Sequence, residues 1–182
     1  MVWSMLAAVA AAVAAPIAPG VTPPKDHVPT DVRRLTILVR DVDASLKLYR
    51  DVLGLQVNYD AVIPVSGVAL PAGVAGNKTR LVLLNGNDAW VGWIGLMEYT
   101  DPPLADPGPY PTRLPRGGHV IVMNTDDAAT RCVAAKAVPG VTFTADVHVS
   151  EYPGRNGAPV IRVRGCNFFD PDGTFIELNQ IL

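Results

Sequence analysis

Hydrophobic and polar positions follow the same order twice along the chain. Each time an apolar, β-rich run comes first, a helical pattern with aspartates before it and a glycine after it comes next, and three more strand patterns close the stretch. In the first stretch the predicted elements are a strand at 35–39, a helix at 42–53 and strands at 55–59, 80–84 and 90–99. In the second they are a strand at 119–123, a helix at 128–138 and strands at 141–149, 159–169 and 174–182. The pattern therefore predicts an internal repeat of strand, helix and three strands.

The segment between the two stretches, residues 101–118, contains six prolines, which exclude regular structure there. We expect one domain over 33–182, made of module one (33–100), a Pro-rich crossover (101–118) and module two (119–182). Neither module can bury its sheet face alone. The predicted fold is therefore α+β, with two tandem βαβββ modules forming a curled half-barrel sheet around a cavity.

The first residues differ from the rest. Residues 1–15 are apolar and uncharged, and small-x-small sites follow, which is typical of a signal peptide, although no Lys or Arg precedes the run. We interpret 1–24 as a signal peptide or a disordered leader and 25–32 as a linker. The expected location is outside the cytoplasm, periplasmic or secreted, with no transmembrane span in the mature chain. If the leader is not a signal, the protein is cytoplasmic.

Charge and cysteine content narrow the class of protein. The formal net charge is -2 and the basic residues are scattered, which argues against nucleic acid as a partner. The two cysteines, Cys132 and Cys166, fall in a predicted helix and a predicted strand. They could pair in an exported protein. The alternative, which we favour from the sequence, is two buried free thiols.

Three motifs resemble those of a known superfamily. The opening, VRRLTILVRDVDASLKLYRDVLGLQV, with Asp41, Ser45, Tyr49 and Leu53-Gly54, is similar to the start of the vicinal oxygen chelate (VOC) superfamily, which includes glyoxalase I, bleomycin-resistance proteins and extradiol dioxygenases. GGHVIVMNTDD resembles the start of the family's second module, and FFDPDGTFIEL resembles its closing hairpin. The resemblance covers about residues 33–182.

The resemblance implies a divalent metal held by one side chain from the first strand and one from the last strand of each module. In module two it points to His119 and Glu177, which suit Fe, Mn, Ni, Zn or Co. Counting back seven residues from Asp41, as His119 lies seven before Asp126, gives Arg34, which cannot bind a metal. The last-strand position of module one is Gly95. We therefore expect a degenerate site with one divalent metal or none.

Other residues complete the candidate site. We expect Glu177 to be catalytic, either as a proton shuttle or as a metal ligand, and Arg34, Thr36 and Trp93 to bind the substrate. Arg34 could instead neutralise Glu177 in a buried ion pair, or replace the charge of the metal by binding a carboxylate or enolate. The strand period places His148 on one face with Thr142, Thr144 and Asp146, which we interpret as a solvent face.

Two functions remain open. The chain could be a glyoxalase- or dioxygenase-like protein, a lyase, isomerase or dioxygenase acting on a small organic molecule. It could instead be a metal-free binding protein of the bleomycin-resistance type. In both cases the partner is a small-molecule ligand, and a homodimer is possible because many members of the superfamily share cavities across a dimer interface.

Overall fold

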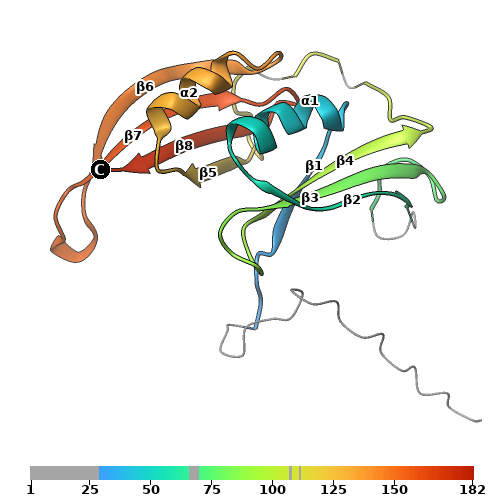
Figure 1. Ribbon diagram of the computed structural model, residues 1–182, viewed down its shortest axis with the longest axis horizontal. Helices are drawn as coiled ribbons and strands as arrows, with labels where there is room; N and C mark the ends of the chain where they lie inside the picture. The colour runs from blue at the N-terminus through green and yellow to red at the C-terminus, as the bar shows by residue number, and fades with distance from the viewer. Residues whose placement is uncertain (1–28, 66–69, 107, 111) are drawn as a thin grey trace, which may run out of the picture.

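A computed structural model describes residues 29–65, 70–106, 108–110 and 112–182 of the chain, and the predicted leader lies outside them. The twofold repeat is confirmed (Figure 1). Module one contains β1 (Arg34–Leu38), α1 (Val42–Leu46), η1 (Lys47–Val52), β2 (Gln56–Pro64), β3 (Lys78–Asn85) and β4 (Trp93–Asp101). Module two contains β5 (Val120–Asn124), α2 (Ala128–Lys136), β6 (Thr142–Tyr152), η2 (Arg155–Gly157), β7 (Ile161–Phe169) and β8 (Phe175–Ile181). Within the described residues, no helix is both long and apolar enough to cross a membrane.

Each module forms its own four-stranded sheet with the same topology. The strand orders are β1-β4-β3-β2 and β5-β8-β7-β6. In both sheets the first strand pairs in parallel with the last strand of its module, and the other pairs are antiparallel. The first strands β1 and β5 therefore lie at one edge of their sheets.

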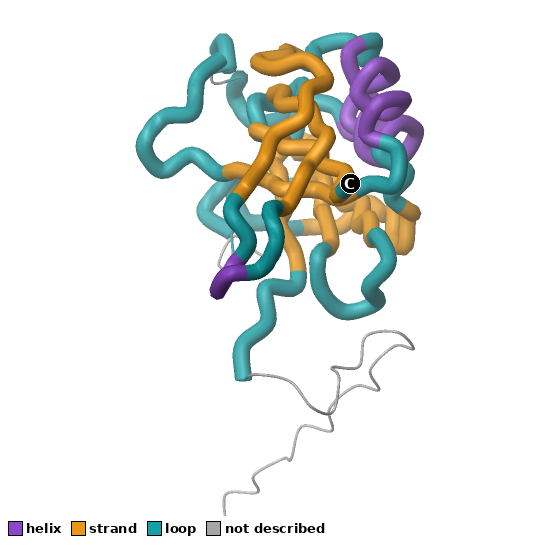
Figure 2. The backbone as a smooth tube through the Cα atoms, turned by 90° about the vertical axis from the view of Figure 1, so that its left-hand side faces the viewer, coloured by secondary structure: helices purple, strands orange, loops and turns teal. Residues whose placement is uncertain are grey.

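The two sheets lie side by side as an open, curled half-barrel (Figure 1). The edges formed by β1 and β5 come close to each other, since Arg34 and Ile94 line the same cavity as residues 121–124. Figure 2 shows both longer helices on the same side of the strands. We call the opposite side, turned away from α1 and α2, the concave face.

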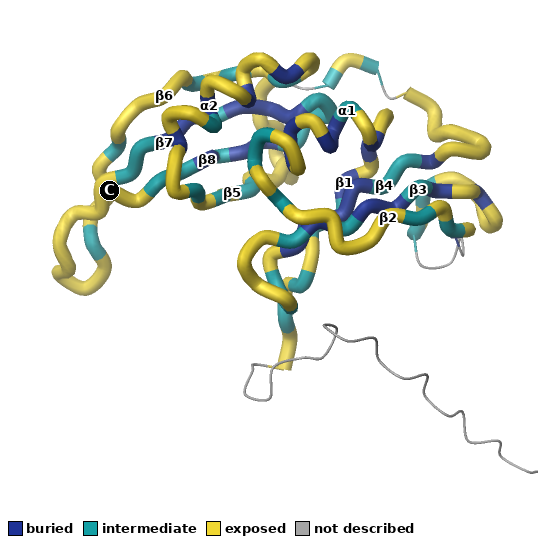
Figure 3. Tube along the Cα trace, viewed as in Figure 1, coloured by how far each residue is buried: buried dark blue, intermediate teal, exposed yellow. Residues whose placement is uncertain are grey.

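An apolar core lies between the helices and the sheets and includes residues of both modules. Along β8, Ile176 and Leu178 are buried in this core whereas Glu177 between them is partly exposed, as the strand period predicts. Figure 3 shows the buried positions concentrated where the strands pass under the helices. The core side of the half-barrel is thus filled, and the concave face is the side that can receive a ligand.

The modules repeat the same helix start. Asp41 caps α1 and Asp127 caps α2, each by accepting a hydrogen bond from the backbone N–H three residues later. The last strand of each module supplies a second acceptor: Glu98 binds the N–H of Val42, and Gln180 binds the N–H of Ala128. These contacts fix each helix over its own sheet.

The opening and closing motifs bind each other across the modules. The Tyr49 hydroxyl donates to Asp170 Oδ2 at 2.7 Å, and the Ser45 hydroxyl donates to Asp172 Oδ2 at 3.1 Å. Arg40 Nε lies 3.3 Å from Asp172 Oδ1, and the Arg40 guanidinium also donates to the carbonyl of Pro171. The helix face of module one is therefore docked on the β7–β8 turn of module two.

Several boundaries differ from the sequence expectation. β2 continues to Pro64, beyond the strand predicted at 55–59, because Val62 and Ile63 pair with Arg80 and Thr79 of β3. The predicted helix 42–53 widens after Leu46, where the N–H of Leu53 donates to the carbonyl of Leu48, five residues back. Trp90 falls outside β4, since Asp88 Oδ1 accepts the N–H groups of Trp90 and Val91 and turns the chain there.

The expectation of two free thiols is wrong. Cys132 of α2 and Cys166 of β7 form a disulfide, with their Cα atoms 6.1 Å apart. Both residues are buried in the common core. The sequence could not settle this point, because the pairing depends on where the helix lies over the sheet.

Candidate functional site

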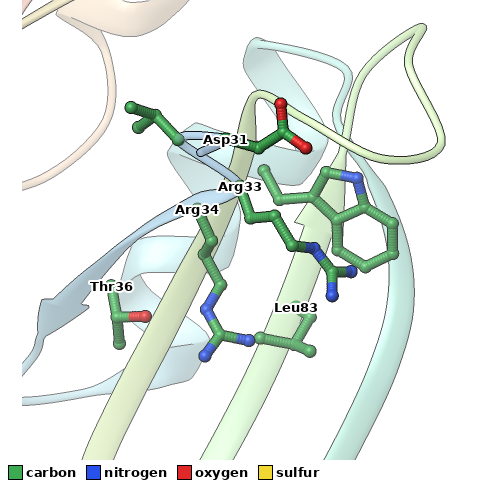
Figure 4. A pocket seen from close by; sticks show the side chains of 7 residues that line it. Asp31, Arg33, Arg34, Thr36 and Leu83 are labelled. Carbon is green, nitrogen blue, oxygen red and sulfur yellow. The ribbon is translucent and has the colours of Figure 1, made fainter. Parts of the chain in front are cut away.

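A cavity of about 570 Å³ lies on the concave face of the first sheet, at the start of β1. Arg34, Thr36 and Trp93, the three residues predicted to bind substrate, all line it (Figure 4). Leu83 of β3 also lines it, since its neighbours Val82 and Leu84 point into the core. The structure therefore brings these three predicted residues together in one place.

Gly95 determines how Arg34 lies in this cavity. Gly95 is paired with Thr36 across the β1–β4 ladder. A Cβ atom at Gly95 would lie 2.8 Å from Thr36 Oγ1 and 3.2 Å from Arg34 Cδ. The missing side chain thus leaves the space that Arg34 and Thr36 occupy, and Figure 4 shows Arg34 extending across the sheet toward Leu83.

The two adjacent arginines have different surroundings. Arg33 lies with its guanidinium carbon 3.9 Å from the centre of the Trp90 ring, and its Nε donates to the Trp90 carbonyl. The Arg34 side chain is exposed, and within the described part of the chain it makes no hydrogen bond or ion pair. The cavity lining contains two guanidinium groups and one carboxylate, that of Asp31, so its electrostatic character is cationic.

His119 is not the residue of module two that pairs with Glu177. The α2 cap is Asp127, one residue beyond the Asp126 from which His119 was counted, so the residue equivalent to Arg34 is Val120. Glu177 pairs with Val122, which lies three positions after His119. His119 itself precedes β5, which begins at Val120, and it lines a different cavity from Arg34.

The donor set at the four family positions is therefore Arg34, Gly95, Val120 and Glu177, of which only Glu177 can bind a metal. Among the residues that the structure describes, no group of three His, Cys, Asp or Glu side chains is placed to hold a metal ion. These residues do not fit a resident divalent metal. The alternative in which Arg34 neutralises Glu177 is also not observed, because no ion pair joins the two side chains in the described chain.

The remaining candidates occupy separate places. His119 lines a cavity of about 360 Å³ between the modules, together with Thr36 and Phe169. His148 is exposed, as expected, but two bulges in β6 break the predicted alternation and pair it with Gly165. The sequence did not identify Asp31 and Arg33 as cavity residues. Both precede β1, and outside a strand no alternation of polar and apolar residues indicates which way a side chain points.

The comparisons with known proteins agree with this architecture. A family profile described as the Glyoxalase/Bleomycin resistance protein/Dioxygenase superfamily matches residues 31–178. A search of curated proteins found no match. The chain is similar to the solved structure of a glyoxalase family protein from Bacillus cereus, with a TM-score of 0.64 and 17% identity over 87% of this chain and 97% of that one.

Two further solved structures show the range of the similarity. A glyoxalase I variant from Zea mays has a TM-score of 0.50 and 18% identity, covering 81% of this chain and 46% of that one. An antibiotic binding protein from a Streptomyces species has a TM-score of 0.45 and 21% identity, covering 86% and 100%. At such identities the matches to the Bacillus cereus and Zea mays structures show the fold alone, but the family profile spans most of the sequence. This chain therefore belongs to the Glyoxalase/Bleomycin resistance protein/Dioxygenase superfamily.

Proposed function

We propose that this protein binds a small organic anion in the Arg34 cavity without a resident metal. The observation that carries the proposal is the exchange of residues at the family positions of module one, where Gly95 has no side chain and Arg34 fills the space. A guanidinium supplies a permanent positive charge and a planar pair of donors, which suits a carboxylate or an enolate oxygen. Arg34 would thus take the place of the metal's charge.

The surroundings support a ligand with an apolar body. Leu83 and Trp93 line the cavity beside Arg34, and Thr36 adds a hydroxyl next to the guanidinium. The cavity volume of about 570 Å³ lies in the usual range of small-molecule sites. The preferred ligand class is therefore an organic monocarboxylate with an aromatic or branched aliphatic group.

Catalysis on the bound molecule is the second candidate. It is favoured by one observation: Thr36 lines both the Arg34 cavity and the neighbouring cavity that contains His119. The His119 imidazole can donate a hydrogen bond to, or accept one from, a molecule that reaches that cavity. Glu177, the catalytic residue expected from the sequence, is not among the residues that line the Arg34 cavity.

The test is a titration of the protein with aromatic and aliphatic monocarboxylates that carry hydrogen, hydroxyl or oxo groups at carbon 2, followed by calorimetry and tryptophan fluorescence. Arg34→Ala is expected to weaken binding by about 10- to 100-fold, as the loss of a charge-assisted hydrogen bond implies. Gly95→Ala keeps the charge but displaces Thr36 and Arg34, and should weaken binding less. Arg155→Ala removes an exposed arginine in η2, far along the chain, and serves as the matched control.

Two results would contradict the proposal. One is equal affinity of the wild type and Arg34→Ala for every carboxylate that binds. The other is stoichiometric divalent metal in the purified protein whose removal abolishes binding. Consumption of a carboxylate by the wild type, lost in His119→Ala with binding retained, would establish the second candidate.

A further inference from the structure

A second cavity lies at the opposite end of β1 from Arg34. It has a volume of about 380 Å³ and is lined by Leu38–Arg40, Tyr99 of β4, residues 103–106 and Tyr110. We call it the crossover pocket, because residues 103–106 and Tyr110 belong to the Pro-rich crossover. It shares no lining residue with the Arg34 cavity, and the strand between Arg34 and Leu38 measures about 13 Å at roughly 3.3 Å per residue.

The walls of the crossover pocket are apolar. Val39 and Tyr99 are buried at its base. Leu38 and Leu104 are 40% and 38% exposed, so two large aliphatic side chains are presented to the cavity. Removing such surface from water is favourable, and an apolar molecule between these side chains would gain that free energy.

The charged groups of the pocket are already engaged. The Arg40 guanidinium binds Asp172 and lies 4.3 Å from the centre of the Tyr110 ring. Asp106 Oδ1 accepts the backbone N–H of Gly108 at 2.9 Å. The two charged lining groups have opposite sign, so a charged ligand would find no net counter-charge. Burial and the nearby Asp172 carboxylate raise the pKa of Tyr110, which therefore stays a neutral phenol.

The crossover wall is held in place before any ligand arrives. Pro103 and Pro109 restrict the backbone immediately before Leu104 and immediately before Tyr110, respectively. Tyr110 packs on the β7–β8 turn so closely that a Cβ at Gly173 would lie 2.9 Å from Tyr110 Cβ. A preformed wall lowers the cost of ordering on binding.

We propose that the crossover pocket is a second small-molecule site, for a neutral ring-containing apolar compound. A dry apolar cavity of about 150 Å³ holds benzene, so a cavity of about 380 Å³ accommodates a compound of two rings. This site does not depend on Arg34 or on the anion proposed above.

The experiment is a fluorescence titration of the full chain with N-phenyl-1-naphthylamine, a neutral dye whose emission rises and shifts to the blue in apolar sites. Ala105→Trp fills the pocket and Leu104→Asp places a carboxylate in its wall, and each should weaken dye binding at least about tenfold. Val133→Asp alters an apolar side chain that is 70% exposed on α2 and is the matched control. Arg34→Ala should bind the dye as the wild type does. The near-ultraviolet circular dichroism of each variant reports whether the fold is kept.

Saturable one-to-one binding that is weakened by both pocket variants and by neither Val133→Asp nor Arg34→Ala would support the site. Unchanged binding in both pocket variants, loss of binding in Arg34→Ala, or no saturable binding would overturn it. A dimer that Leu104→Asp converts to a monomer, with no dye bound, would also overturn it, because the pocket would then accept a second copy of the chain.

Discussion

Asp88 in the β3–β4 turn and Asp170 in the β7–β8 turn occupy the same place in their modules, five residues before Trp93 and Phe175. In both turns the Oδ1 atom accepts two backbone N–H groups. These bonds lower the pKa of the exposed Asp88 carboxyl. Burial raises the pKa of Asp170, which is only 2% exposed, although Tyr49 donates a hydrogen bond to it. The same turn is thus a surface feature in one module and a buried docking point in the other.

The contact of helix and sheet differs in a similar way. The register places Leu46 and Val82 of module one where Cys132 and Cys166 stand in module two. All four are buried in the common core. Module one holds its helix by apolar packing, whereas module two adds a covalent bond.

The concave faces differ most. Arg34 and Gly95 of module one correspond to Val120 and Glu177 of module two. Positions that cap helices and turns are the same in both modules, while positions that face the cavity are not. Backbone geometry therefore constrains the first set, whereas it leaves the side chains of the second set free to differ.

Removing the disulfide would leave module two to hold its helix by apolar packing alone, as module one does. We expect this change to lower the unfolding free energy more than any other change considered below. The bond closes a loop with a sequence separation of 34, for which chain entropy predicts a loss of about 3–4 kcal/mol on reduction. Chemical denaturation with and without dithiothreitol measures this. The double variant Cys132→Ala/Cys166→Ala is the control, because its unfolding free energy should not respond to the reductant. An equal response in both proteins would contradict a structural role for the bond.

Much of the fold could be predicted from the sequence because its signals are local. The caps at Asp41 and Asp127 and the period of the strands depend on neighbours along the chain, and they give the elements and the repeat. The segment at 61–64 lies outside the strand predicted at 55–59, because its residues show no strand pattern by themselves and become a strand only by pairing with β3. Structure that depends on pairing between distant segments could not be predicted from such local signals.

The candidate site shows the same division. Arg34, Thr36 and Trp93 could be assigned to one cavity, since strand alternation fixes the face of each side chain. The pairing of His119 with Glu177 could not be assigned safely, because two adjacent aspartates, Asp126 and Asp127, both qualify as helix caps. A shift of one residue reverses the face of a side chain.

Tyr49→Phe tests the docking of module one on the buried turn. It removes one hydrogen bond from the carboxyl of Asp170 and should lower the unfolding free energy by about 1–3 kcal/mol. Equilibrium unfolding in urea measures the change. Tyr152→Phe, at a tyrosine that is exposed in β6, is the matched control and should change little. Equal effects of the two substitutions would mean that the Tyr49 hydroxyl does not hold the modules together.

The comparison of Asp88 and Asp170 predicts pH dependences of opposite sign, the smallest effect of the three. The folded pKa of Asp170 lies above 3.8, so between 3.8 and that raised value the folded state binds more protons and stability falls as pH rises. The folded pKa of Asp88 lies below 3.8, so its stabilising effect is complete above 3.8 and is lost as pH falls through the folded pKa. Asp170→Asn should therefore remove a negative slope of unfolding free energy against pH, and Asp88→Asn should remove a positive one.

Urea unfolding of both variants and the wild type, from below pH 3.8 to neutrality, measures the slopes. If both substitutions change the slope in the same direction, the two turns do not differ in the way that their burial implies.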